Sequence, residues 1–244
     1  MSAVAVAPTT TARPGTVVAL LALLQAATRG APRDSFIHLN AACGASWIGA
    51  AGVFIPTHHV DDELLPTSLL ALLERDRERP WTLRLATRTA AAQPAPLSLG
   101  ILAVSARVPR RFENPRQPGS KHGREWIPDH AAQDAAIERM IAITPPSIGL
   151  RSWERVTAAW ALSEPVDVSR QAGAAAALRA LQQLATRVGG EAPENLLDVA
   201  VPLPAFAAES QREQDTTRVV SLAPSRTYTL DAIAAALSAA RGSR

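Results

Sequence analysis

The residues with the clearest capacity for chemistry lie in one basic segment, residues 107–124 (RVPRRFENPRQPGSKHGR). A single acid, Glu113, stands there against these cations: Arg107, Arg110, Arg111, Arg116, Lys121 and Arg124. Such cations neutralise phosphates, and the proline and glycine residues favour an irregular loop that can follow a nucleic-acid backbone. Phe112, with His122 nearby, offers a surface for base stacking. We expect this loop to bind nucleic acid, and the alternative is a solvated loop without function.

A second cluster, within residues 58–63, carries metal-ligand chemistry: His58, His59, Asp61, Asp62 and Glu63. Adjacent histidines on extended backbone point to opposite sides, so they rarely share one ion. The carboxylates also suit a helix start, where they complement free amide groups. We therefore expect no metal site. Because the sequence has no Gly-x-Ser-x-Gly elbow, P-loop or dinucleotide fingerprint, we expect no cofactor either.

The total charge of the chain does not by itself indicate a partner. The 244 residues carry a net charge of +3, which is too small to imply nucleic acid. Lys121 is the only lysine among 25 basic residues, so nearly all the cations are bidentate guanidinium groups. Phosphate binding would use them, but a genomic bias toward arginine and alanine codons explains them equally well.

Cysteine content and hydropathy bear on the compartment. Cys43 is the only cysteine, which excludes an intramolecular disulfide and favours a reducing compartment, so we expect a cytoplasmic protein. No apolar run approaches the ~20 residues that cross a bilayer, and we expect no membrane partner. With 47% hydrophobic residues, the chain can bury one sizeable core.

The patterns along the chain predict alternating helices and strands. Residues 1–15 read as a flexible tail, and residues 16–244 as one domain. We expect helices over residues 16–29, 61–75, 129–141, 169–188 and 229–240, and strands over 34–39, 46–54, 81–87, 97–108, 155–162, 197–203 and 218–222. A polar loop over residues 109–128 separates two of them. This order predicts an α/β or α+β fold with one central sheet.

Three segments, in this order, resemble the archaeo-eukaryotic primase superfamily, in particular bacterial plasmid and phage replication primases. They are residues 81–88 (WTLRLATR), residues 159–167 (AWALSEPVD) and residues 218–231, which include RVVSL and SRTYTLD. In the second, an aromatic strand runs into an E-P-V-D turn and a long helix. The resemblance covers about residues 80–240. It implies an RRM-like central sheet flanked by helices.

The departures from this family all fall on chemistry. The resemblance places the metal-binding Asp-x-Asp at Ser105 and Arg107, and the nucleotide-binding histidine at Thr157. A hydroxyl and a guanidinium cannot hold divalent metals. Asp198 matches the third carboxylate, but residues 199–204 lack the arginine and lysine expected after it. We therefore interpret these positions as degenerate, with no catalytic residue among them.

Arginines on the strand at residues 81–88 complete the expected binding surface. Arg88, with Arg84 beside it, resembles the family's cleft arginine and would meet phosphate. A salt bridge on a sheet face is the alternative for both residues.

The sequence thus predicts a catalytically inactive, primase-like protein that binds DNA or RNA. It would act alone or with protein partners in a replication, mobile-element or defence assembly. One alternative is an active primase or nucleotidyltransferase that uses Asp198 with Glu154 or Asp167. The other is a structural subunit held by apolar and tryptophan-bearing surfaces, with Trp126 and Trp153 at an interface.

Overall fold

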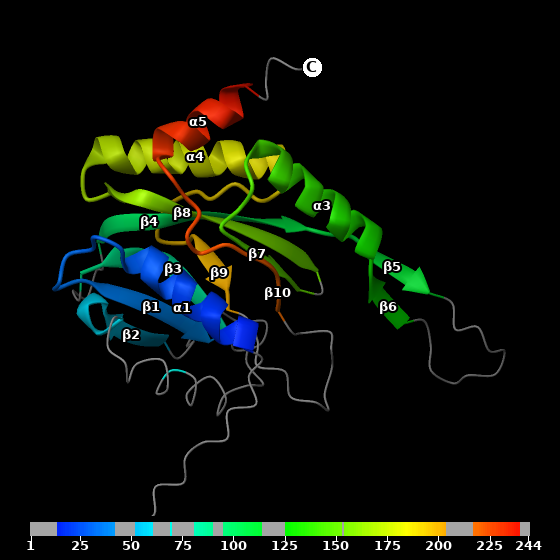
Figure 1. Cartoon of the computed structure of the whole chain (residues 1–244), viewed down its shortest axis with the longest axis horizontal. Helices are drawn as coiled ribbons and strands as arrows, with labels where there is room; N and C mark the ends of the chain where they lie inside the picture. Colours follow the sequence, from blue (N-terminus) through cyan, green and yellow to red (C-terminus); the bar gives the residue numbers. More distant parts are fainter. Residues whose placement is uncertain are drawn as a thin grey trace, which may run out of the picture.

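The fold is built on a nine-stranded sheet that carries helices on its faces (Figure 1). The computed structural model describes residues 14–41, 52–60, 69, 81–89, 95–113, 125–152, 154–203 and 217–239. The strands follow the order β10-β7-β8-β4-β3-β1-β2, with β11 beside β8 and β9 beside β3. Their bounds are β1 (Phe36–Ala41), β2 (Gly52–Pro56), β3 (Trp81–Arg88), β4 (Pro96–Arg107), β7 (Ile148–Arg151), β8 (Arg155–Asp167), β9 (Ala200–Pro202), β10 (Arg218–Leu222) and β11 (Thr227–Tyr228). This architecture confirms the predicted fold class and its single central sheet.

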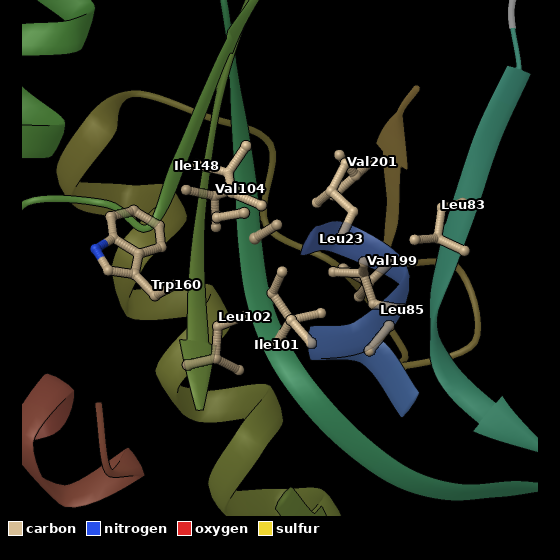
Figure 2. Packing of buried hydrophobic residues seen from close by; sticks show 14 of the residues in the cluster. Leu23, Leu83, Leu85, Ile101, Leu102, Val104, Ile148, Trp160, Val199 and Val201 are labelled. Carbon is tan, nitrogen blue, oxygen red and sulfur yellow. The ribbon is translucent and has the colours of Figure 1, made fainter. Parts of the chain in front are cut away.

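Strands β4 and β8 form the centre of the sheet and of the hydrophobic core. They pair antiparallel from Ser98 opposite Asp167 to Arg107 opposite Arg155. In Figure 2, Ile101 points toward Leu23 of the first helix, whereas Leu102 lies on the side of Trp160. The core therefore occupies both faces of β4, which explains why its sequence is almost continuously apolar.

Helix α1 (Pro14–Thr28) lies against β3 and β4, in front of the sheet in Figure 1. Leu20, Leu23 and Leu24 are its largest buried side chains. The helix approaches β4 so closely that a Cβ on Gly100 would lie 2.1 Å from the Ala26 carbonyl oxygen. Gly30 follows the helix with φ +60°, a conformation that favours glycine.

Three further α-helices have both ends within the described residues: α3 (His130–Ile143), α4 (Gln171–Val188) and α5 (Leu230–Ala239). Figure 1 shows α5 above α4 and oblique to it, on the far side of α4 from the strands. Asp129 caps α3 by accepting a hydrogen bond from the Ala132 amide, and the Trp160 indole donates to the Thr144 carbonyl at 2.9 Å. The second of these bonds ties the end of α3 to β8. Among the described residues, no helix has the length and apolar character needed to cross a membrane.

The loop predicted over residues 109–128 is partly regular structure, which corrects the prediction. Strands β5 (Arg110–Glu113) and β6 (Glu125–Pro128) form a separate two-stranded ribbon that projects from the body beside α3 (Figure 1). Phe112 stands opposite Trp126 in the register. Between the two strands stand Pro115, Pro118, Gly119 and Gly123, whereas Pro109 and Pro128 fall at the opposite end of the ribbon, where Pro128 is the last residue of β6. Residues 114–124 lie outside the described part of the chain.

The predicted E-P-V-D turn is also wrong, because β8 continues through it to Asp167. The pairing with β4 shifts between Leu99 and Ile101, so several β8 residues oppose Gly100. Pro165 fits this bulge because an irregular stretch does not require its missing N–H. The following helix consequently starts at Gln171 rather than at residue 169.

Other boundaries differ from the prediction in smaller ways. Helix α1 begins at Pro14, inside the predicted tail, whose first 13 residues are not described. Strands β7 and β11 were not predicted. Of the predicted helix over residues 61–75 only Leu69 is described, and it is helical and buried. The strand predicted over residues 46–54 is described only from residue 52, where β2 begins.

Candidate nucleic-acid interface

Ser105, where the primase resemblance expects a metal-binding carboxylate, is hydrogen-bonded to Thr157, where it expects the nucleotide-binding histidine. Ser105 on β4 stands directly opposite Thr157 on β8, and their oxygens are 2.7 Å apart. Thr157 is buried, whereas Ser105 is partly exposed. A neutral hydroxyl pair offers a cation no charge, and its hydrogen bond already occupies part of its donor and acceptor capacity.

Arg107 extends the same strand toward solvent. Its guanidinium lies 3.8 Å from the Glu154 carboxylate, and 65% of its side chain is exposed. A cavity of about 340 Å³ is lined by Arg107, Val108, Pro109 and Glu154. Because Pro109 leads directly into β5, this cavity lies at the base of the projecting ribbon.

Asp198 interacts with Asn195 and Arg84. It bonds to the Asn195 amide, and its own backbone amide donates to Asn195 Oδ1 at 3.0 Å. Its carboxylate lies 3.7 Å from Arg84 Nη1 and is well exposed. Within the described residues, the hydrogen bonds and ion pairs of Asp198 lead to Asn195 and to β3, not to Ser105.

The two carboxylates considered as its partners are also engaged. Glu154 faces Arg107. Asp167 accepts hydrogen bonds from the Ser169 amide and hydroxyl and pairs with Arg170 at 3.1 Å. The hydrogen bond from the Ser169 hydroxyl is the main cause that lowers the pKa of Asp167. In the part of the chain that is described, no three His, Cys, Asp or Glu residues gather closely enough to hold a metal ion.

The predicted cleft arginines differ sharply in their surroundings. Arg84 donates to the Leu197 carbonyl at 3.1 Å and faces Asp198. Arg88 is 6% exposed, and its Nε and Nη2 atoms have no hydrogen-bond partner among the described residues. Burial lowers the pKa of Arg88 most, Arg84 lowers it further, and Asp198 opposes both effects. A salt bridge thus accounts for Arg84 but leaves Arg88 unexplained.

An aromatic pair beside these arginines was missed by sequence reasoning. His38 on β1 stacks on Phe54 of β2, with ring centroids 4.2 Å apart and planes inclined by 4°. His38 is also opposite Arg84 in the pairing of β1 with β3. The alternation of side chains within each strand predicts which residues share a face of the sheet. It does not predict that His38 and Phe54 are opposite each other, because the register also depends on the length and path of the segment between β1 and β2.

Burial is the largest cause that lowers the pKa of His38, to about 4, with further lowering by Arg88 and then Arg84. The imidazole is therefore neutral near pH 7 and adds no charge to the two guanidinium groups. Its buried Nδ1 atom has no hydrogen-bond partner in the described structure.

The remaining predicted residues fall into two groups. Arg110 and Arg111 lie on β5, close in sequence to Arg107 at the end of β4. Arg116, Lys121 and Arg124 lie outside the described residues, as does Trp153. The predicted binding residues are therefore divided between the base of the ribbon and strand β3.

The histidine cluster differs from its expected geometry. His58 and His59 lie on the 3-10 turn η1 (Thr57–His59), not on extended backbone. Their rings consequently lie 4.3 Å apart and tilted by 41° instead of pointing to opposite sides. His58 Nδ1 is 2.9 Å from the Arg33 carbonyl oxygen, and residues 61–63 are not described.

Comparison with solved structures identifies the fold. The chain is similar to the AEP domain of the primase-polymerase of cyanophage S-2L, with a TM-score of 0.54 and 12% identity over 93% of this chain and 99% of that one. It is also similar to the primase RepB′, with a TM-score of 0.50 and 12% identity over 93% of this chain and 64% of that one. No family model and no curated protein matches the chain. The chain thus has the primase-like fold of the archaeo-eukaryotic primases.

Proposed function

We propose that this primase-fold chain is a catalytically inactive protein that binds DNA or RNA within a replication, mobile-element or defence assembly. The observation that carries the proposal is the 2.7 Å hydrogen bond between Ser105 and Thr157. Two-metal nucleotidyl transfer requires anionic oxygen ligands, and a neutral pair followed by the cation Arg107 opposes metal binding. The same cation attracts phosphate.

The ribbon and its base supply the main binding surface in this proposal. Arg107 is exposed beside the cavity at that point, and β5 adds Arg110 and Arg111. A two-stranded ribbon has dimensions that fit the major groove of a duplex, and flanking cations can contact the phosphates. Residues 114–124, which join the two strands, contribute Arg116, Lys121 and Arg124.

The test is salt-dependent binding of single-stranded DNA, duplex DNA and RNA, measured by fluorescence anisotropy. Neutralising Arg110, Arg111 and Arg116 together to glutamine should weaken binding and reduce the salt slope by about 3, since each arginine that neutralises a phosphate contributes close to one. A variant with Arg33, Arg139 and Arg179 changed to glutamine serves as the matched control. These exposed arginines lie elsewhere, and their loss changes the net charge equally.

Three results would overturn the proposal. Equal binding by the triple variant and its control would exclude the ribbon as the binding surface. Metal-dependent incorporation of labelled nucleotides that disappears in Asp198→Ala would establish an active nucleotidyltransferase. Copurification with a protein partner after nuclease treatment, without any nucleic-acid binding, would instead establish a structural subunit.

A further inference from the structure

An exposed aromatic ring, a histidine and two arginines, one of them buried, lie on the outer strands β2, β1 and β3 of the sheet. Phe54 is 50% exposed although it stacks flat on His38. In the register, Phe54 is opposite His38, and His38 is opposite Arg84. Three adjacent strands therefore place a ring, a ring and a guanidinium in one row about 10 Å long.

Within the described part of the chain, the positive charge of these arginines is not balanced. The carboxylate recorded near Arg84 and Arg88 there is Asp198, which is largely exposed and bonded to Arg84 and Asn195. Arg88 is only 6% exposed. Even so, its Nε and Nη2 atoms have no hydrogen-bond partner among the described residues. Leaving a buried cation unpaired is costly, so the site favours an anionic ligand.

We propose that this row, together with Arg88 on the same strand as Arg84, forms a nucleotide subsite, in which a phosphate meets Arg88 and Arg84 and a base stacks on the exposed part of Phe54. The subsite rests on the proposed nucleic-acid function and adds a second contact, separate from the ribbon. The base contributes through stacking, which every base can provide, so the subsite does not select sequence. Phosphate can come from a free nucleotide or from one unit of a strand.

The test uses the full chain and three small probes: adenosine monophosphate, ribose 5-phosphate and adenosine. Phe54→Leu should weaken binding of adenosine monophosphate roughly 5- to 100-fold, because it removes the ring but keeps an apolar side chain. The same variant should bind ribose 5-phosphate as the wild type does. Arg88→Met should lose both phosphate-bearing probes. Ile141→Ala, at an exposed apolar position on α3, is the control.

Folding of the variants is checked by thermal denaturation. Arg88→Met removes an unpaired buried charge and should melt no lower than the wild type without ligand. Should it fail to fold, Arg84→Gln replaces it, because Arg84 is partly exposed and its loss should still weaken the phosphate probes.

Oligothymidylate and its abasic analogue test whether the subsite binds one nucleotide of a strand rather than a free nucleotide. If the subsite accepts only strands, Phe54→Leu should weaken oligothymidylate binding and leave binding of the abasic strand unchanged. The ribbon triple variant should weaken oligonucleotide binding but bind adenosine monophosphate normally, so failure of the ribbon and failure of this subsite are separate results. Unchanged binding of both adenosine monophosphate and oligothymidylate by Phe54→Leu would overturn the subsite.

Discussion

At the scale of single residues, the hydrogen-bonded hydroxyl groups of Ser105 and Thr157 bear on both the proposed function and the stability of the fold. The two hydroxyl oxygens hydrogen-bond to each other across β4 and β8. A buried polar group is stable there because its partner lies directly opposite in the register. The sequence identified these two residues individually, but the sheet register established that they bond.

This pair gives a prediction for unfolding in urea. Ser105→Ala should destabilise the fold by about 1 kcal/mol, because Thr157 is buried and would lose its bonded partner. The double variant Ser105→Ala/Thr157→Val should recover part of that loss, since it removes both polar groups. Additive losses in the double-mutant cycle would contradict a direct interaction.

His38 gives a prediction for pH. Its pKa is about 4 in the fold against 6.5 as the ordinary value, so the unfolded chain binds the proton more readily between these pH values. Stability should therefore fall as the pH drops from above 6.5 toward 4, by about 1–2 kcal/mol after allowance for the partly exposed ring. The charged groups that oppose protonation are Arg88 and Arg84.

Urea denaturation at pH 7.5 and pH 5 measures this effect. His38→Phe keeps an aromatic ring but cannot titrate, so it should lose less stability over the same interval than the wild type. An identical loss in both proteins would show that other groups, not His38, govern the acid sensitivity.

At the scale of elements, the packing of α1 against β4 requires a residue without a side chain at Gly100. Gly100 lies in β4 at the bulge where the pairing with β8 shifts, and its Cα faces the end of α1. Its role is close approach, because the Ala26 carbonyl occupies the space that a Cβ would need. The apolar run of β4 predicts burial but not which helix covers it.

Gly100→Ala should consequently cost about 3 kcal/mol, as expected when a well-packed core is overfilled. Amide exchange should accelerate most in α1, which must move away from β4. Gly189→Ala is the comparison, because Gly189 has φ +74° but open space around its Cβ position. It should destabilise the end of α4 and leave exchange in α1 unaltered, and equal acceleration in both variants would exclude the packing explanation.

At the scale of the whole molecule, the ribbon formed by β5 and β6 is a separate sheet from the body. No strand of the main sheet pairs with it among the described residues, so the core does not depend on it for hydrogen bonds. The proposed subsite on β1, β2 and β3 lies on the body itself. The molecule thus has two proposed contact regions. The ribbon is separate from the main sheet, whereas the subsite is formed by strands of the main sheet itself.

Replacing residues 110–128 with a short Gly-Ser linker tests this independence. The melting temperature should change by only a few degrees, because Asp129 still caps α3 and the core is intact. Oligonucleotide affinity should fall at least as far as in the arginine triple variant. Loss of cooperative unfolding in circular dichroism would show instead that the ribbon supports the body.

The sequence by itself determined the fold class, the buried strand β4 and the chemical types at residues 105, 107 and 157. Hydrophobic periodicity and side-chain chemistry are local properties, so they can be read along the chain. Tertiary structure alone decided the bond between Ser105 and Thr157, the ion pair of Asp198 with Arg84, and the pairing of β5 with β6. It also decided the row of Phe54, His38 and Arg84, because register between distant strands is set by pairing and burial of the whole sheet.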